Sequence, residues 1–257
     1  MLRVATFNAN GIRSAADKGF FDWMQAADLD VVCIQETKAQ EHQLAANPQF
    51  YPEGYHCYYH DAEKKGYSGV AIYSRIKPDA IITGMGNPIF DSEGRYIEAQ
   101  YGDLSIVSLY LPSGSSGEER QAFKYQCMEY FTQCLVSMGQ SGRRYIIGGD
   151  WNIAHQTIDL KNWKANQKTT GFLPEERAWL DKIFGEWGFV DAFRVVNQDA
   201  EQYTWWSYRA NAWAKNVGWR IDYQVISSRL REQVGHAYVY KDERFSDHAP
   251  LVVDYLL

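Results

Sequence analysis

Short apolar runs, each closed by turn-forming residues, recur along this 257-residue chain and limit what it can fold into. They lie at residues 2–7, 31–35, 69–73, 80–83, 96–100, 104–111, 144–148, 221–226, 236–240 and 250–256. Several carry β-branched residues and are bounded by Gly, Pro, Asn or Asp, which is typical of β-strands. Pro112, for example, closes the run 104–111 because proline cannot continue a hydrogen-bonded ladder. So many short strands predict β-sheets that must be covered on their apolar faces.

Helical periodicity appears between these runs. The longest example covers residues 118–138, where apolar side chains recur at a spacing close to 3.6 residues. Ser116 followed by Glu119 predicts a capping box at its start. Residues 17–27 and 174–185 are two further predicted helices. Many strands and a few helices in one chain predict packed sheets with helices outside.

The chain has no low-complexity tract, long charge run or Pro/Ser linker, so residues 1–257 are predicted to form a single domain. No apolar run could span a membrane, and the N-terminal segment MLRVATFNANG does not resemble a signal peptide, because polar residues follow its short apolar run at once. The cysteines contain no C-x-x-C pair, which favours reduced thiols in a cytoplasmic protein. A net charge of −6 argues against a protein that coats nucleic acid generally, although carboxylates collected around a cation would hide a local basic surface.

Polar side chains of a few kinds stand where the predicted strands end. They are Asn8 and Asn10, Glu36, Tyr110, Asp150 and Asn152, Asp222, and Asp247 with His248. Each alone has an ordinary explanation, because Asp and Asn are common in turns. Asp222 is harder to explain in this way, since a carboxylate between Ile221 and Tyr223 is costly to bury without a donor. His248 is its natural partner, because a carboxylate often orients an imidazole.

These residue types suit the hydrolysis of a phosphate ester. Glu36, Asp247 and Asn10 offer the hard oxygens that Mg²⁺ or Mn²⁺ prefers, whereas no Cys/His cluster has the spacing of a zinc site. The others would act on substrate: Asn8, Asn152 and Tyr110 as donors to phosphate, Asp150 on the attacking water, and His248, kept protonated by Asp222, as a positive charge beside the phosphoryl group. Together they predict a phosphoester hydrolase.

The segments that carry these residues resemble, in order, the signature segments of the exonuclease III family of apurinic/apyrimidinic endonucleases. They read FNANGIRSA, CIQETK, KGYSGVAIYSR, DSEGRYI, LYLPSG, GGDWNIAHQTIDLKNWKANQK, GFLPEERAWL, YTWWSYR, NVGWRIDYQ and SDHAPL. They run from residue 3 to residue 254 without a large gap, and such an ordered set is far more specific than one short motif. The resemblance implies the DNase I-like fold, an α+β four-layer sandwich of two packed, mostly antiparallel β-sheets flanked by helices.

The resemblance also implies a role for each strand-end residue. Glu36 would be the principal metal ligand, with Asn10 and Asp247 near it and Asp150 and Asn152 as further candidates. Asp150 would direct the attacking water, Asp222 and His248 would form a phosphate-contacting dyad, and Asn8 and Tyr110 would hold the scissile phosphate. Gly148 and Gly149 would bring this strand end close to the substrate, and His155 would be structural or would support the site from behind. Asn10 stands where several relatives carry Asp, which lowers the negative charge of the metal site. Ser113 stands where some relatives carry Asn or Gln, which changes one expected contact with phosphate.

Two segments predict a surface that faces DNA. Residues 203–220 and 161–174 lack acidic residues and combine Trp with Arg and Lys, which suits stacking on sugars and contacts with phosphates. The resemblance adds a pocket for a flipped abasic sugar, formed by Trp205, Trp219 and Ile221. An abasic nucleotide costs little to extrude because no base is stacked there. The resemblance further assigns DNA contacts to Arg209, Asn166, Arg13, Lys38, Tyr67 and Arg95, of which the last four could equally be ordinary surface or supporting residues.

The resemblance therefore implies a Mg²⁺-dependent DNA-repair nuclease, with Mn²⁺ as a substitute metal. It would cut the backbone 5′ to abasic sites and process 3′ ends as an exonuclease and as a 3′-phosphatase or phosphodiesterase. The expected partner is double-stranded DNA with abasic sites or 3′ blocks, and the protein is expected to be a cytoplasmic monomer with no membrane partner. Two alternatives stay open: a catalytically weak regulator that binds nucleic acid, and a phosphatase of the same fold that acts on lipids or small phosphoesters.

Overall fold

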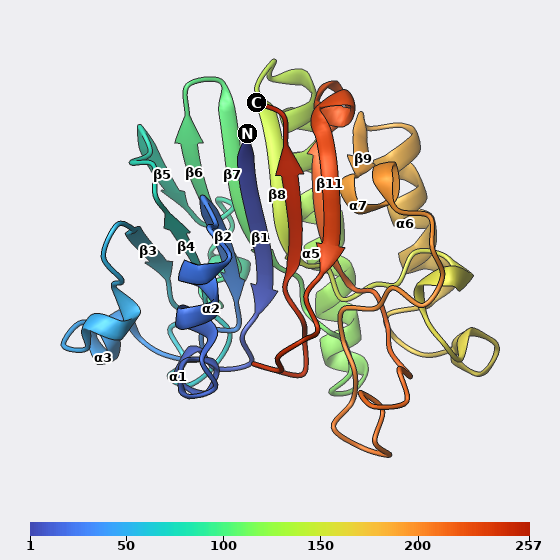
Figure 1. Cartoon of the computed structure of the whole chain (residues 1–257). Helices are drawn as coiled ribbons and strands as arrows, with labels where there is room; N and C mark the ends of the chain where they lie inside the picture. The colour runs from blue at the N-terminus through green and yellow to red at the C-terminus, as the bar shows by residue number, and fades with distance from the viewer.

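The computed structural model describes all residues from 1 to 257 and contains two six-stranded β-sheets packed face to face (Figure 1). The first has the order β11 (Val234–Val239), β12 (Leu251–Tyr255), β1 (Leu2–Asn8), β2 (Val31–Gln35), β4 (Val70–Ser74) and β3 (His56–His60). The second has the order β5 (Ala80–Thr83), β6 (Tyr96–Tyr101), β7 (Leu104–Tyr110), β8 (Arg144–Asp150), β10 (Asp222–Ser227) and β9 (Phe189–Asp191). Only the pairs β1–β2 and β7–β8 are parallel, so the predicted mostly antiparallel sheets are confirmed.

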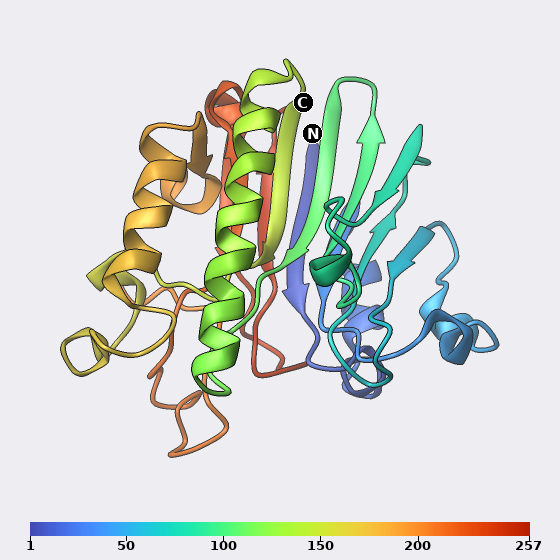
Figure 2. The same ribbon diagram turned by 180° about the vertical axis from the view of Figure 1, so that it is seen from behind.

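Helices cover the outer face of each sheet, which confirms the predicted four layers (Figures 1 and 2). α1 (Ile12–Asp17) and α2 (Phe20–Ala26) lie on the first sheet, and α5 (Glu118–Gln140) and α6 (Pro174–Gly185) lie on the second. The remaining helices are α3 (Glu41–Leu44), α4 (Pro88–Asp91) and α7 (Ala192–Val196), with 3-10 turns at Pro48–Phe50, Thr157–Asp159, Trp163–Asn166 and Ser228–Gln233. No helix has the length and apolar character that a membrane span requires.

Apolar side chains fill three interlayer spaces. Between the two sheets lies a cluster that includes Val4, Cys33, Ile106, Ile146 and Val253. The outer clusters join the first sheet to α1 and α2, and the second sheet to α5 and α6. The central strands are therefore buried on both faces, which explains why they read as nearly continuous apolar runs in the sequence.

Most apolar runs coincide with strands, but some local predictions are wrong. The predicted helix 17–27 is α2, which begins only at Phe20 because Gly19 precedes it at a φ of 89°, and the helix α1 before it was not predicted. The predicted capping box is absent: Gly117 precedes α5 and no side chain caps this helix. The strands β3 and β9 were not predicted, since β3 has the polar, half-exposed sequence HCYYH and β9 has only three residues.

The strand directions bring several strand ends to one edge of the sandwich, the lower edge in Figure 1. β1 and β2 are parallel, as are β7 and β8, so each pair ends at the same level. β12 and β10 run antiparallel to β1 and β8, so their first residues lie beside those ends. The chain termini lie at the opposite end, where the Met1 ammonium donates to the Leu257 carbonyl at 3.0 Å.

Candidate active site

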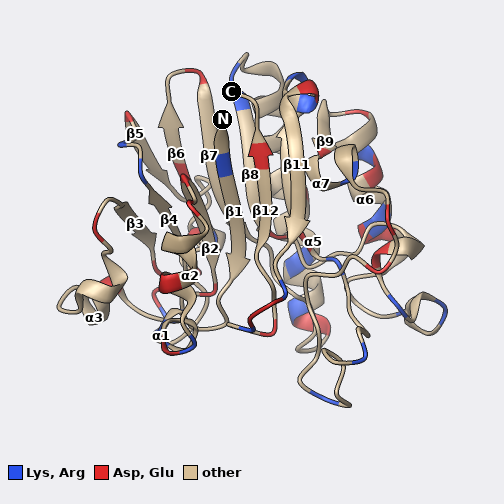
Figure 3. Cartoon of the chain, viewed as in Figure 1, with Lys and Arg blue, Asp and Glu red and all other residues tan.

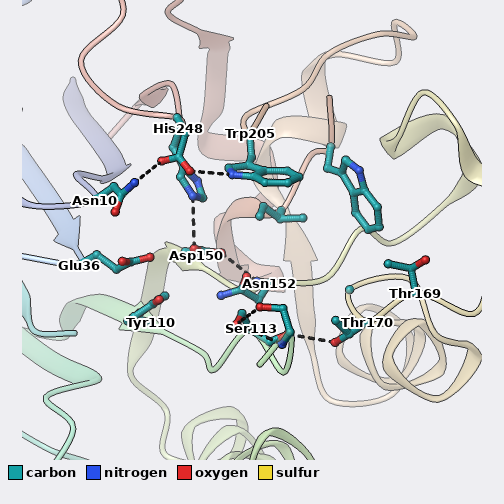
Figure 4. A pocket seen from close by; sticks show the side chains of 15 residues that line it. Asn10, Glu36, Tyr110, Ser113, Asp150, Asn152, Thr169, Thr170, Trp205 and His248 are labelled. Atoms are coloured by element: carbon teal, nitrogen blue, oxygen red, sulfur yellow. Dashed lines mark hydrogen bonds and ion pairs between the residues drawn. The ribbon is translucent and has the colours of Figure 1, made fainter. Parts of the chain in front are cut away.

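The strand-end residues surround one cavity of about 360 Å³ at this edge (Figure 4). Both sheets contribute residues to this cavity. The sequence indicated a common site only because the strand ends carry the same few kinds of polar residue. The cavity is lined by Asn10, Glu36, Tyr110, Asp150, Asn152, Asp247 and His248, by Trp205, Trp219 and Ile221, and by Ser113, Ser115, Thr169, Thr170 and Gly171. Asn8 and Asp222 lie directly behind this lining and are fully buried.

Asp150, the last residue of β8, is the centre of the site. Its buried carboxylate accepts hydrogen bonds from the Asn8 amide at 2.8 Å and from the Asn152 backbone N–H at 2.9 Å. Burial and the charge of Asp222 raise the pKa of Asp150 to about 8, against the opposing charge of His248. With a pKa of about 8, the neutral and ionised forms of Asp150 coexist near neutral pH, and the ionised form can take a proton from water.

Asp222 and His248 form a buried pair beside Asp150, as the cost of burying Asp222 predicts. Asp222 Oδ2 and His248 Nδ1 are 2.8 Å apart, and His248 Nε2 lies 3.8 Å from Asp150 Oδ2. Burial alone would lower the pKa of His248, but the carboxylates of Asp222, Asp150 and Asp247 outweigh it and raise this pKa to about 10. The imidazole therefore carries a positive charge at neutral pH, next to the Asp150 carboxyl group.

A second group of oxygen atoms follows the ends of β1 and β2. Asn10 Nδ2 donates to Asp247 Oδ1 at 3.1 Å, and Asn8 Nδ2 donates to Glu36 Oε1 at 3.0 Å. The Lys38 ammonium lies against this group, 2.5 Å from Asn10 Oδ1 and 3.3 Å from Glu36 Oε2. These oxygens thus hold a positive charge in the structure, and hard oxygen donors of this kind fit Mg²⁺ or Mn²⁺.

Two groups of side chains could hold a metal ion. Asp150, Asp222 and His248 have ligand atoms within 4.8 Å of one another, but the His248 ring is cationic and its Nδ1 is bonded to Asp222, which opposes ligation. The second group, Glu36 with Asn10 and Asp247, needs no loss of a proton before it can bind a metal ion. Burial would raise the pKa of Asp247, but the charge of His248 and the Trp205 N–H, 3.0 Å away, hold that pKa below its usual range, so Asp247 is anionic. The Glu36 group is the better candidate.

Strained backbone conformations also gather here. Asn10, Glu36, Lys38 and Asn152 have φ angles of 43°, 50°, 49° and 52°, in the left-handed region that side chains other than glycine rarely adopt. Asn tolerates this region, whereas Glu and Lys pay about 1 kcal/mol or more each. Such strain is common where a site must hold its side chains in fixed directions.

Tyr110 ends β7 and faces the cavity. Burial and the Glu36 carboxylate raise its pKa well above the usual value, although the Arg95 guanidinium stacks 4.8 Å from the ring centre. Tyr110 is therefore a neutral phenol that can donate a hydrogen bond. Arg95 is only 2% exposed and donates to Glu93 and to Tyr67. Arg95 also donates to the Tyr110 carbonyl at 3.1 Å, which agrees with the second reading of this residue, a supporting role, while its contact with DNA stays a prediction.

The glycine pair of β8 has a different role from the predicted one. A Cβ atom at Gly149 would lie 2.2 Å from the Leu109 carbonyl oxygen of β7, and one at Gly148 would lie 3.2 Å from Thr6 in the opposite sheet. The pair therefore lets β8 approach its neighbouring strand and the facing sheet, and this approach brings Asp150 to Asn8. It does not itself face the cavity.

The geometry agrees with what comparison with known proteins shows. The sequence matches the Endonuclease/Exonuclease/phosphatase family over residues 5–248. The chain belongs to this family. An exodeoxyribonuclease of Bacillus subtilis (strain 168) is 40% identical over 252 residues, which cover 97% of this chain and 98% of that protein. The DNA repair nuclease APEX1 of Danio rerio is 38% identical over 98% of this chain and 81% of its own length. The structure of an AP endonuclease from Archaeoglobus fulgidus has a TM-score of 0.90 and 29% identity, and the match covers 100% of both chains.

In this member of the Endonuclease/Exonuclease/phosphatase family, the predicted DNA-contact residues take several positions. Trp205, Trp219 and Ile221 line the cavity, as the predicted sugar pocket requires. Arg209 and Arg13 are exposed and Asn166 is half-buried, all outside the cavity lining, and Tyr67 donates to Glu93 at 3.5 Å. Lys38 is drawn inward to the Glu36 group rather than outward.

The loops beside the cavity carry basic residues, as Figure 3 shows at the lower right. The segments 161–174 and 203–220 both project beyond the strand ends at this edge (Figure 1). Within them Trp206 is fully buried and belongs to a small core with Tyr203 and Ala212. His155 also lies outside the cavity, where its Nε2 contacts Asp181 at 2.6 Å, so it is structural as expected.

Sequence reasoning missed the cavity wall formed by Ser115, Thr169, Thr170 and Gly171. These are small or hydroxyl-bearing residues without a titratable group, so nothing in their chemistry singles them out. A signal was present for Thr169, Thr170 and Gly171, because they lie in the segment 161–174, which lacks acidic residues, whereas Ser115 lies in the loop after β7.

Proposed function

We propose that this protein is a metal-dependent DNA-repair phosphodiesterase that cuts the backbone 5′ to abasic sites. The proposal includes exonuclease and 3′-phosphatase or phosphodiesterase activity at 3′ ends of duplex DNA. The observation that carries it is one cavity that joins a proton-accepting Asp150, a cationic His248 and a group of hard oxygens to an apolar wall. The names of the bacterial exodeoxyribonuclease and of the fish DNA repair nuclease support the same assignment.

The metal we propose is Mg²⁺, with Mn²⁺ as a substitute. Glu36, Asn10 and Asp247 would hold it, with Asp150 and Asn152 close by. When bound, such an ion neutralises charge on the phosphate and polarises it for attack. Since Asn10 contributes an oxygen without charge, the anionic donors are Glu36 and Asp247, in keeping with the one or two carboxylates that Mg²⁺ usually takes from a protein.

Asp150 is the proposed base. It takes a proton from a water molecule whose oxygen attacks the phosphorus. The bond from phosphorus to the 3′ oxygen of the preceding sugar breaks, and this oxygen leaves with the electron pair and takes a proton from solvent. The products are a 3′ hydroxyl and a 5′ phosphate on the abasic residue. The Asn8 amide fixes the carboxylate in direction through its 2.8 Å hydrogen bond. Tyr110 does not compete as the base, because its raised pKa keeps it a neutral donor. His248 faces the phosphoryl charge that grows in the transition state.

Substrate choice is proposed to come from the apolar wall. Trp205 and Trp219 meet edge to face with ring centres 6.3 Å apart, and Ile221 packs beside them. An apolar wall of this kind suits a deoxyribose that carries no base. An abasic nucleotide is extruded from duplex DNA at a lower free-energy cost than a paired nucleotide, because no base stacking or pairing is lost.

A nicking assay on an abasic duplex tests the proposal. The expected result is cleavage on the 5′ side of the abasic site with Mg²⁺ and no cleavage with a chelator. The nicking rate of Asp150→Asn and of Glu36→Ala should each fall about a hundredfold or more. Asp181→Asn, at an exposed carboxylate outside the cavity, is the control and should retain activity. Binding of DNA without cleavage would favour the regulator, and hydrolysis of phospholipid headgroups or small phosphoesters that duplex DNA does not inhibit would favour a phosphatase.

We further propose that the 257 residues act as one monomeric unit in the cytoplasm. The four cysteines are all free thiols, and burial raises the pKa of Cys33 and of Cys127, so neither is a reactive thiolate. Such thiols fit a reducing compartment. Size-exclusion chromatography with light scattering tests the monomer, and a panel of abasic, 3′-phosphate and blunt duplexes measures the balance among the activities.

A further inference from the structure

A buried ion pair lies behind the cavity wall, where the site described above does not use it. Lys124 of α5 and Glu176 of α6 are fully buried, with Nζ and Oε1 2.8 Å apart. Desolvation makes such a pair a poor source of stability, and a well-packed apolar pair of similar size is often as stable or more so. Its contacts point to a role beyond joining two helices.

Lys124 reaches two backbone carbonyls of the cavity lining. Besides Glu176, its ammonium donates to the Asn152 carbonyl at 2.9 Å and to the Ser113 carbonyl at 3.4 Å. An ammonium has three donors, so all of them are engaged. The Asn152 carbonyl belongs to the peptide after Asn152, whereas the N–H that donates to Asp150 belongs to the peptide before it, so Lys124 holds the side of this residue that faces the wall.

Glu176 holds the opposite side of the same wall. Its Oε2 accepts from the backbone N–H groups of Gly171 at 2.7 Å and Leu173 at 3.2 Å, and its Oε1 accepts from Gln121 at 3.1 Å and Thr170 at 3.3 Å. A helix cap alone would explain the bond to Leu173 at the start of α6. It would not explain the bonds to Gly171 and Thr170, which line the cavity.

The wall that the pair holds is in close contact with the apolar side of the cavity. A Cβ atom at Gly171 would lie 3.2 Å from the Trp219 ring and 3.3 Å from the Asn152 carbonyl oxygen. The Gly171 carbonyl also accepts from the Ala154 N–H at 2.7 Å. A shift of Gly171 therefore moves one side of the space beside Trp219, and none of these contacts involves Asp222 or His248.

We propose that the Lys124–Glu176 pair is a positioning device that sets the width of the sugar pocket between residues 169–171 and Trp219. It thereby favours substrates that insert an abasic nucleotide over substrates that present only a 3′-terminal phosphate. The inference rests on the proposed function, because it concerns the choice between two substrates of the same site. Neither residue touches the reacting atoms, so both act through the wall.

The test compares two substrates on variants of the pair. Glu176→Gln keeps the shape of the side chain, and the double variant Lys124→Met/Glu176→Gln removes both charges without leaving either unpaired. Steady-state kcat and KM are measured on a duplex with a tetrahydrofuran abasic analogue and on a nicked duplex with a 3′ phosphate. Glu98→Gln is the matched control, since Glu98 is a buried carboxylate that accepts from Tyr96, Gln100 and Ser105 away from the cavity.

We expect the double variant to lose about tenfold to a hundredfold in kcat/KM on the abasic duplex, mainly through KM, and less than about threefold on the 3′ phosphate. The control should lower the melting temperature without changing the ratio between substrates. Equal losses on both substrates, or no loss on either, would overturn the inference. A wild-type protein that cleaves neither substrate would instead contradict the proposed function.

Discussion

The charge of His248 depends on Asp222, and this dependence gives the sharpest prediction. With a pKa of about 10, the wild-type imidazole is protonated at pH 7.5 by roughly 300 to one. The folded state binds this proton more tightly than the unfolded chain, whose histidines titrate near 6.5. Its contribution to stability is therefore complete below about pH 6.5 and is lost as the pH rises towards 10.

Asp222→Asn keeps the shape of the side chain and an acceptor for Nδ1 but removes the charge. Burial has the largest effect on the pKa of this ring and lowers it. In the variant only the charges of Asp150 and Asp247 would still raise this pKa. The pKa should fall to about 6.5 or below, a change of about 3.5 units or more, which is about 5 kcal/mol between the two protonation states. At pH 7.5 no more than about a tenth of the rings would stay protonated, and about three quarters at pH 6.

Two measurements check this prediction. The ring resonances of His248 are titrated by NMR in the metal-free protein, and the nicking rate on an abasic duplex is followed from pH 6 to pH 8.5. The nicking rate of the variant should be about tenfold or more below that of the wild type at pH 7.5, and much closer to it at pH 6. Asp181→Asn, beside His155, is the control, since it removes a carboxylate from a histidine outside the cavity. A ring that still titrates above pH 9, or an activity loss that is the same at every pH, would refute the reasoning.

Further predictions concern the metal group, the core and DNA. Lys38→Met removes the ammonium from the Glu36 and Asn10 oxygens, so the dissociation constants of Mg²⁺ and Mn²⁺ should fall about threefold to tenfold in calorimetric titration, and weaker binding would show that Lys38 helps the metal. Asp159 lies 2.8 Å from both Arg194 and Arg220, whose charges outweigh burial and lower its pKa to about 2. Its stabilising effect is complete above about pH 4 and fades towards pH 2, so in urea unfolding Asp159→Asn should cost about 2–3 kcal/mol at pH 7 and roughly 1 kcal/mol less at pH 3; a cost independent of pH would contradict this. Binding of duplex DNA should weaken with a slope of about −4 to −5 in log K against log salt, as expected for about 4–6 neutralised phosphates, and a flat response would exclude the basic loops as the binding surface.

The sequence predicts the strands well wherever both faces are buried. The run 31–35 becomes β2 without a change of bounds, because every one of its residues is covered. β3 could not be predicted in this way, because it lies at the edge of a sheet and most of its side chains are polar and partly exposed. The pairing of Asp222 with His248 was also predictable, because a buried carboxylate must have a donor.

What the sequence could not provide was the topology and the direction of long side chains. The meeting of Asn8 with Asp150 requires β1 and β8 to face each other from different sheets, which no local pattern encodes. Lys124 and Glu176 look like ordinary charged positions on amphipathic helices, and only the packing of α5 against α6 makes them a fully buried pair. Lys38 could have pointed to solvent, but nearby oxygens draw it inward.

β12 has a consequence for the synthesis of this protein. It is the last strand of the chain, yet it lies inside the first sheet between β11 and β1, and Asp247 and His248 stand just before it. A ribosome releases Asn8, Glu36 and Asp150 long before these residues emerge. In the proposed mechanism, the growing polypeptide therefore gains its complete set of site residues only when the last strand is made and inserts between β11 and β1.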